Sequence, residues 1–184
     1  MTAAPAGSVD TPGAPRADHA PLLVTALFDA AGFAWLDGLR RRHYPPERNR
    51  VPAHCSMFRQ LPPSAAEEVR HRLSAAVRTW RAPRAVITGP ILLDQGVALR
   101  IDSPEMEDLR AQLAEDFTGL LPMADRDGWR PHVTIQNKVP PREARALYHA
   151  LERDLAPRAV RVAGLAAWRW RGGPWDSFSR HMFA

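Results

Sequence analysis

Two short motifs in the sequence each place a histidine two residues before a hydroxyl side chain. They are His54-Cys55-Ser56 and His132-Val133-Thr134, and 78 residues separate each position of the first from its counterpart in the second. An imidazole can give or take a proton near neutral pH, and a hydroxyl can hydrogen-bond a phosphate oxygen. Two such pairs suit displacement at phosphorus, because the attacking oxygen must lose a proton while the leaving oxygen gains one.

Both motifs lie in apolar stretches that predict β-strands, at 51–61 and 130–139. Residues two apart on a strand point to the same face, so the histidine and hydroxyl of each motif should lie together, roughly 6 to 7 Å apart. A phosphate group fits between them. We expect His54 and His132 to act as acid and base, in an order that the residues leave open, and Ser56 and Thr134 to bind phosphate oxygens. This requires the two motif strands to be adjacent in one sheet.

Three further side chains share the face of the second motif by the same alternation. Arg130, Gln136 and Lys138 are therefore possible substrate contacts, although each is also typical of an ordinary surface position. Arg59 is out of phase with His54 unless a β-bulge shifts the alternation, and it is left out of the candidate site. Cys55 should face the core, which argues against a nucleophilic role.

The elements that must position the motifs follow from apolar periodicity. It predicts strands over 22–28, 51–61, 85–93, 97–102, 130–139, 159–171 and 175–183, and helices over 31–43, 64–80, 103–120 and 140–155. The chain at 94–96, Asp-Gln-Gly, is typical of a hairpin turn. Each half thus runs strand, helix, motif strand, helix and strand, which predicts an α+β fold of two related lobes with antiparallel or mixed sheets facing across a groove.

Composition limits the class of protein. Residues 1–20 are rich in Ala, Pro and Gly and predict a disordered leader, which leaves 21–184 as one two-lobed domain. No apolar run is long enough to cross a membrane, and a single cysteine suits a reducing cytoplasm. The net charge of +5 is compatible with a polyanionic ligand. Nothing in the sequence indicates an obligate protein partner.

The paired motifs, with Arg130-Pro131 directly before the second, resemble those of the 2H phosphoesterase superfamily, in particular its bacterial 2′-5′ RNA ligase-like branch. The resemblance covers residues 20–184. It implies a two-lobed α+β fold with a pseudo-twofold axis, and a hydrolase or ligase that acts without metal or other cofactor. The implied activity is that of a cyclic phosphodiesterase on 2′,3′-cyclic or 2′-5′ phosphodiesters of RNA or nucleotides. Ser56 stands where threonine is common in that family.

Two alternatives remain from the residues. The groove could belong to a non-catalytic nucleotide- or RNA-binding module, or His181 could join His54 and His132 in a metal site, although no carboxylate or cysteine is spaced to support it. Several aromatic residues near the C-terminus could stack on bases, but we expect them to pack in the core. They are Trp168, Trp170, Trp175 and Phe178.

Overall fold

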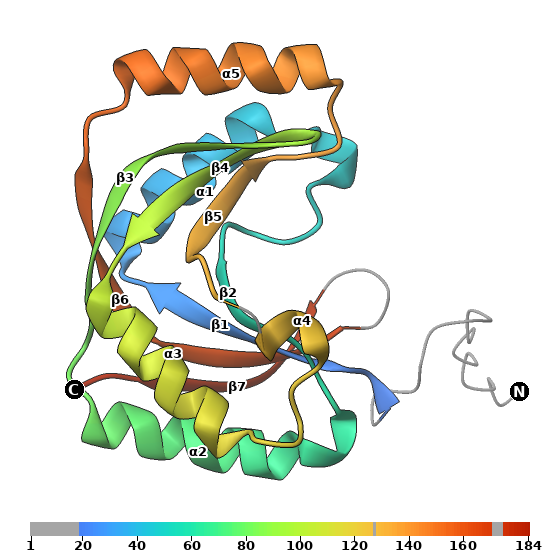
Figure 1. Ribbon diagram of the computed structural model, residues 1–184, viewed down its shortest axis with the longest axis vertical. Helices are drawn as coiled ribbons and strands as arrows, with labels where there is room; N and C mark the ends of the chain where they lie inside the picture. The colour runs from blue at the N-terminus through green and yellow to red at the C-terminus, as the bar shows by residue number, and fades with distance from the viewer. Residues whose placement is uncertain (1–18, 127, 171–174) are drawn as a thin grey trace, which may run out of the picture.

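The computed structural model describes residues 19–126, 128–170 and 175–184 (Figure 1). The expected leader falls mostly outside these residues, as does the turn expected around Gly172-Gly173-Pro174. The fold is α+β, as the sequence predicted. Its strands are β1 (Leu22–Phe28), β2 (Cys55–Leu61), β3 (Arg84–Leu93), β4 (Gly96–Asp102), β5 (His132–Gln136), β6 (Arg158–Trp170) and β7 (Trp175–Met182). Its helices are α1 (Ala30–His43), α2 (Ala66–Thr79), α3 (Pro104–Asp116), α4 (Met123–Arg126) and α5 (Pro141–Asp154), with single 3-10 turns at Pro46–Arg48 and Pro63–Ala65.

The strand order shows the internal repeat. The strands follow one another in the order β2-β1-β6-β3-β4-β5, with β7 paired to β6, and every pairing is antiparallel. The first half supplies β1, β2 and β3, and the second supplies β4, β5 and β6. When β1, β2 and β3 are matched to β4, β5 and β6, the order is symmetric about its centre. The last strand of each half therefore belongs to the lobe of the other half.

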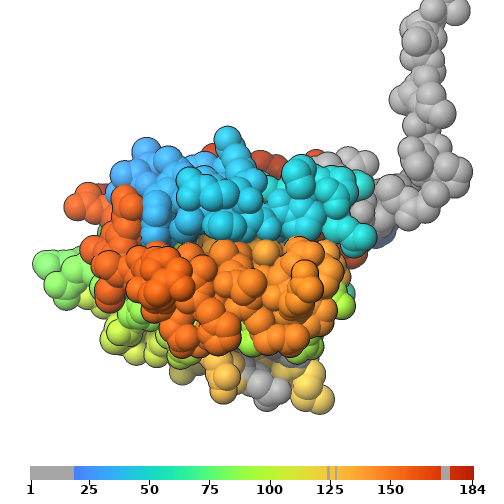
Figure 2. All heavy atoms as spheres, turned by 90° about the horizontal axis from the view of Figure 1, so that it is seen from above, coloured from blue at the N-terminus to red at the C-terminus, as the bar shows by residue number. Residues whose placement is uncertain are grey.

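Helices cover the outer faces of the two lobes (Figure 1). Helix α5 packs on β3 and β4, whereas α2 packs on β6 and β7 at the opposite end of the molecule. Helix α1 lies against both β1 and β5 and so touches both lobes. Seen from above, α1 and the chain that follows it form the surface beside α5 (Figure 2). None of the helices among the described residues is long and apolar enough to cross a membrane.

Local sequence explains where the helices that flank the motifs begin. The Asp29 carboxylate accepts a hydrogen bond of 2.9 Å from the Gly32 amide at the start of α1. Ser103 accepts one of 3.1 Å from the Met106 amide, and Pro104 opens α3. The predicted hairpin is present, because β3 and β4 pair from Leu93 and Gly96 onward.

The core fills the space between the strands and these helices. Alternate residues of β1 face it, as do the apolar stripes of α2 and α3. The largest fully buried side chains are Phe58, Phe117, Leu22, Leu36, Met57, Leu61, Leu73, Ile87, Leu99, Met106, Leu109 and Leu113. Each motif strand packs one face on the buried core that both halves share, so its other face is available to a ligand.

Candidate active site

The two motif strands lie at opposite ends of the strand path. The expectation that they are adjacent in one sheet is therefore wrong. Curvature of the sheets brings β2 and β5 into contact instead, without a ladder between them. The contact is close, since the backbone N–H of His132 reaches the buried thiol of Cys55 and the charge of His132 acts on His54.

Both histidine rings are held in the same way. The Nδ1 atom of His54 lies 2.8 Å from the carbonyl oxygen of Pro52, and that of His132 lies 2.7 Å from the carbonyl oxygen of Arg130. A carbonyl can only accept, so Nδ1 carries the hydrogen in each neutral ring. Neither Nε2 atom has a hydrogen-bond partner among the described residues. Each ring therefore presents an unshared lone pair.

The environment of His54 favours its neutral form. Burial lowers the pKa of His54 to about 4, against the effect of the Pro52 carbonyl, and the positive charges of Arg40 and His132 lower it further. His132 is more exposed than His54. At neutral pH the free protein thus holds at least one uncharged imidazole, which can accept a proton.

The motif hydroxyls are also available. Ser56 and Thr134 are half-buried, and neither hydroxyl has a hydrogen-bond partner within the described part of the chain. Each residue sits directly before a β-bulge, because Met57 is the extra residue opposite Val24 and Thr25, and Ile135 is the extra residue on β5. The bulges are 78 residues apart, like the motifs.

The second bulge corrects two of the predicted substrate contacts. Beyond Ile135 the alternation of faces shifts by one residue, so Gln136 turns inward and is 7% exposed. Strand β5 ends at Gln136, and Lys138 follows in a left-handed backbone conformation with φ of 64°, exposed to solvent. Strand alternation therefore does not place either residue on the face of His132 and Thr134. Arg130 is exposed just before β5, and its backbone carbonyl is the group that orients His132.

A cavity of about 490 Å³ opens beside the first motif. His54, Phe33, Trp168 and Trp175 line it, and the rings of His54 and Trp175 are 4.5 Å apart. The Trp168 indole N–H donates to the Thr25 hydroxyl at 2.8 Å, which fixes the orientation of that ring. The expectation that these tryptophans pack in the core is wrong for Trp168 and Trp175.

The other two residues of this aromatic group, Trp170 and Phe178, lie in different environments. Trp170 is 45% exposed, whereas Phe178 packs partly against the core as expected. Trp168 and Trp170 are two residues apart on β6, yet only Trp168 lies beside the first motif. The signal for Trp168 was in the sequence, as a tryptophan in an alternating strand, but its hydrogen-bond partner Thr25 could not be known without the pairing of β1 and β6.

Two positive side chains complete the cavity wall. Arg50 and Arg180 both line it, and no carboxylate is among its described lining residues. His54 of the first motif lines the cavity, and Thr25, another lining residue, is the cross-strand partner of Ser56. Nothing in the sequence singles out Arg50 or Thr25, because neither belongs to a motif.

Each motif strand accepts a hydrogen bond from a side chain of the other half of the chain. The Trp129 indole N–H donates to the Ser56 carbonyl at 2.9 Å, and Arg40 donates to the Thr134 carbonyl at 2.6 Å. Because β2 and β5 are edge strands, these donors satisfy carbonyl groups that a neighbouring strand would otherwise engage. The lobes are thereby tied across the site.

The buried carboxylate of Asp125 also supports β2. The Asp125 carboxylate accepts from the Arg59 amide at 2.8 Å and from its guanidinium at 3.1 Å. Arg110 donates to the Asp125 carbonyl and stacks 4.8 Å from the Phe58 ring centroid. Arg59 therefore has a structural partner. The bulge at Met57 shifts the alternation of faces by one residue, so the alternation on which Arg59 was left out does not hold beyond Met57.

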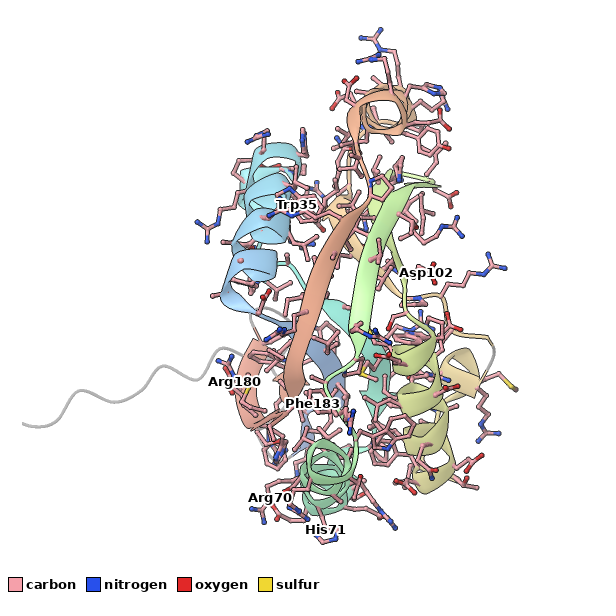
Figure 3. All side chains as sticks on the ribbon, turned by 90° about the vertical axis from the view of Figure 1, so that its left-hand side faces the viewer. Trp35, Arg70, His71, Asp102, Arg180 and Phe183 are labelled. Carbon is pink, nitrogen blue, oxygen red and sulfur yellow. The ribbon has the colours of Figure 1, made fainter. Side chains whose placement is uncertain are left out.

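Two other cysteine and histidine predictions concern this region. Cys55 is fully buried, as expected, and burial raises the pKa of its thiol to about 12. His181 lies on β7 under the charges of Arg70 and Arg78, on the face toward α2, whereas its neighbour Arg180 lines the cavity beside His54. Figure 3 shows Arg70 on α2, at the end of the molecule opposite Trp35 of α1. Among the described residues no three His, Cys, Asp or Glu side chains are grouped as a metal site.

Known structures share this architecture. TT0787 of Thermus thermophilus superposes with a TM-score of 0.64 at 15% identity, over 89% of this chain and 97% of that one. LigT of E. coli, in crystal structures with 3′-AMP and with NADP⁺, gives TM-scores of 0.52 and 0.54 at 18% identity, over 90% of this chain and 98% of LigT. These likenesses show the fold.

The sequence itself matches a family model. No curated protein sequence matches the chain. The model of the 2′-5′ RNA ligase superfamily, however, matches residues 28–174, which include both motifs. The chain therefore belongs to the 2′-5′ RNA ligase superfamily, the ligase-like branch of the 2H phosphoesterases.

Proposed function

We propose that the protein is a metal-independent phosphodiesterase that cleaves 2′-5′ phosphodiesters of nucleotides or RNA and opens 2′,3′-cyclic phosphates. One observation carries the proposal. Two segments in contact each present a histidine with Nδ1 tied to a carbonyl and Nε2 unengaged, next to a hydroxyl without a partner in the described chain. These are the groups that displacement at phosphorus requires on its two sides.

The cavity supports a nucleoside on the side of His54. Its size is in the range that holds small ligands, and its tryptophan rings offer a stacking surface for a base. Arg50 and Arg180 give it a positive charge that suits a nucleotide. The relative LigT binds 3′-AMP and NADP⁺ in its crystal structures, which supports a nucleotide as the ligand class here.

The proposed step follows from that orientation. Neutral His54 takes the proton of the ribose 3′-hydroxyl, whose oxygen attacks the phosphorus of a 2′-5′ linkage. The bond from phosphorus to the 5′-oxygen breaks, and His132 gives that oxygen its proton. The products are a 2′,3′-cyclic phosphate and a free 5′-hydroxyl. Ser56 and Thr134 hold the nonbridging oxygens so that attacking and leaving oxygens stay in line.

The opposite direction uses the same two residues. When water or a 5′-hydroxyl attacks the cyclic phosphate, His132 accepts the proton of the nucleophile and protonated His54 gives one to the departing ribose oxygen. Hydrolysis and ligation then differ only in the nucleophile. The depressed pKa of His54 in the free protein suits the cleavage direction, because that direction begins with His54 neutral.

The test compares His54→Ala and His132→Ala with the wild type. The substrates are 2′-5′-linked diuridine and uridine 2′,3′-cyclic phosphate, and the control is His149→Ala, an exposed histidine of α5. We expect each motif variant to lose about 10²- to 10⁴-fold in kcat with an unchanged circular dichroism spectrum. Full activity in both motif variants would refute the proposal, as would binding of both substrates by the wild type without turnover. Activity that disappears in a strong chelator would instead indicate a metal-dependent hydrolase.

A further inference from the structure

The chain that leads into the first motif has no regular structure of its own. Residues 49–54 lie between the short turn after α1 and the start of β2, outside any strand ladder. Their counterpart before β5 is held differently, because the Ile101 amide of β4 donates to the Pro131 carbonyl at 3.0 Å. Another element must therefore fix the position of His54.

Two buried side chains of α1 meet this segment. Asp37 and Arg40 are three residues apart on one face of the helix, and each is 3% exposed. The Asp37 carboxylate accepts from the Ala53 amide at 2.9 Å. Arg40 Nε donates to the Asn49 side-chain oxygen at 2.8 Å and to the Val51 carbonyl at 3.1 Å.

These contacts determine how the His54 ring is oriented. Pro52 lies between Val51 and Ala53, the two residues that α1 holds, and its carbonyl accepts the Nδ1–H of His54. Because the peptide groups before and after Pro52 are both held by hydrogen bonds with α1, the direction of the Pro52 carbonyl is fixed. The ring of His54 therefore takes its orientation from α1 through the Pro52 carbonyl.

The same guanidinium reaches the second motif. Arg40 Nη1 donates to the Thr134 carbonyl at 2.6 Å, so one planar side chain joins the approach to His54 with the strand of the second motif. No ladder connects β2 and β5, and this link therefore helps to set the separation of the two motifs. A flexible point charge in place of the rigid fork could not hold both carbonyls in the same geometry.

Resting on the proposed function, the structure assigns to Arg40, supported by Asp37, the role of a positioning residue that joins the two motifs and orients His54 for proton transfer. The charged and titratable groups that face this region are few. Asp37 lies beside Arg40 on α1, and Tyr44 directly follows the helix. Arg41 forms an ion pair of 2.6 Å with Asp37, and His132 faces His54 from β5. Arg50 and Arg180 border the cavity next to His54.

The test uses the full chain with its histidine side chains labelled with ¹⁵N. The variants are Arg40→Met, Arg40→Lys and the milder Asn49→Ala, with Arg42→Met as a matched control from the exposed face of α1. Nitrogen chemical shifts report which ring nitrogen of His54 carries the hydrogen and the pH at which the ring titrates. Turnover of 2′-5′-linked diuridine gives kcat and KM. Circular dichroism and thermal unfolding establish that each variant is folded.

For Arg40→Met we expect kcat to fall about 10²-fold with little change in KM, as a displaced catalytic group would produce. The His54 titration midpoint should rise, because a neighbouring positive charge is gone, and the ring should populate both tautomers. Arg40→Lys should also lose kcat, because an ammonium lacks the fork that reaches both carbonyls. Asn49→Ala should lose severalfold, and Arg42→Met should match the wild type.

The assignment would be overturned if Arg40→Lys and Asn49→Ala were folded and had the kcat, the His54 tautomer and the His54 titration of the wild type. These two variants still test the assignment if Arg40→Met does not fold. An effect of Arg42→Met equal to that of Arg40→Met would overturn it as well, since both variants remove one positive charge and the role would then reduce to net charge. The tautomer and titration of His54 need no substrate. If the wild type turns nothing over, the proposed function fails while these two measurements still decide the role of Arg40.

Discussion

The pH dependence of 2′-5′ cleavage tests the role of His54 most directly. The perturbation is pH itself, and the structure sets the expected position of the acid limb. With a pKa of about 4, His54 is about 90% neutral at pH 5, whereas an unperturbed histidine is only about 3% neutral there. If neutral His54 is the base, kcat/KM at pH 5 should therefore be about 30-fold higher than an ordinary imidazole would allow.

The assay follows cleavage of 2′-5′-linked diuridine from pH 3.5 to 8 at constant ionic strength, because uracil does not titrate in this interval. An acid limb near pH 6.5, or activity that rises as the pH falls toward 4, would refute the assignment of His54 as the base. The folded state of the protein must be monitored over the same pH range. The pKa of His54 is lower in the folded than in the unfolded chain, so its contribution to stability is complete above about pH 6.5 and is lost as the pH falls toward 4.

The remaining predictions concern single side chains. Thr134→Ala should lower kcat about 10²- to 10³-fold because a hydrogen bond to the phosphate is lost, whereas Thr134→Ser should restore most of it; equal kcat values for the two variants would contradict phosphate binding by the hydroxyl. Trp175→Ala, which removes the ring packed on His54, should raise KM for nucleotides more than for a simple phosphodiester such as bis(p-nitrophenyl) phosphate; an equal rise for both would argue against base stacking. Gly96→Ala should lower the denaturation midpoint strongly, because a Cβ there would lie 2.0 Å from the Gln136 carbonyl oxygen; an unchanged midpoint in urea would show that the β4–β5 pairing has room to move.

The motifs could be predicted from the sequence because they are local. A histidine and a hydroxyl two residues apart in an apolar stretch define a face as long as the strand is regular. That held from His132 to Thr134, and it failed at Ile135, where the bulge moved Gln136 to the inner face. A bulge depends on pairing with β4, which periodicity along one strand does not report.

The contact between the motifs could not be predicted in the form it takes. Adjacent pairing was the simplest way to bring His54 and His132 together, but the sequence holds no signal for the curvature that does so instead. Two residues connect the motifs. Arg40 lies in a helix, Trp129 lies in the loop before the second motif, and neither is itself part of a motif. Such residues become recognisable only when the carbonyl groups that they engage are seen.

The exchange of last strands between the halves has a consequence for folding. Thr25 of β1 pairs with Ala166 of β6, so the first lobe is incomplete until nearly the whole chain is available. Pairings this distant in sequence cost loop entropy before they contribute stability, which slows folding. Neither half can complete its own sheet, and unfolding should accordingly remove both lobes in one cooperative transition, with no intermediate in which a single half survives.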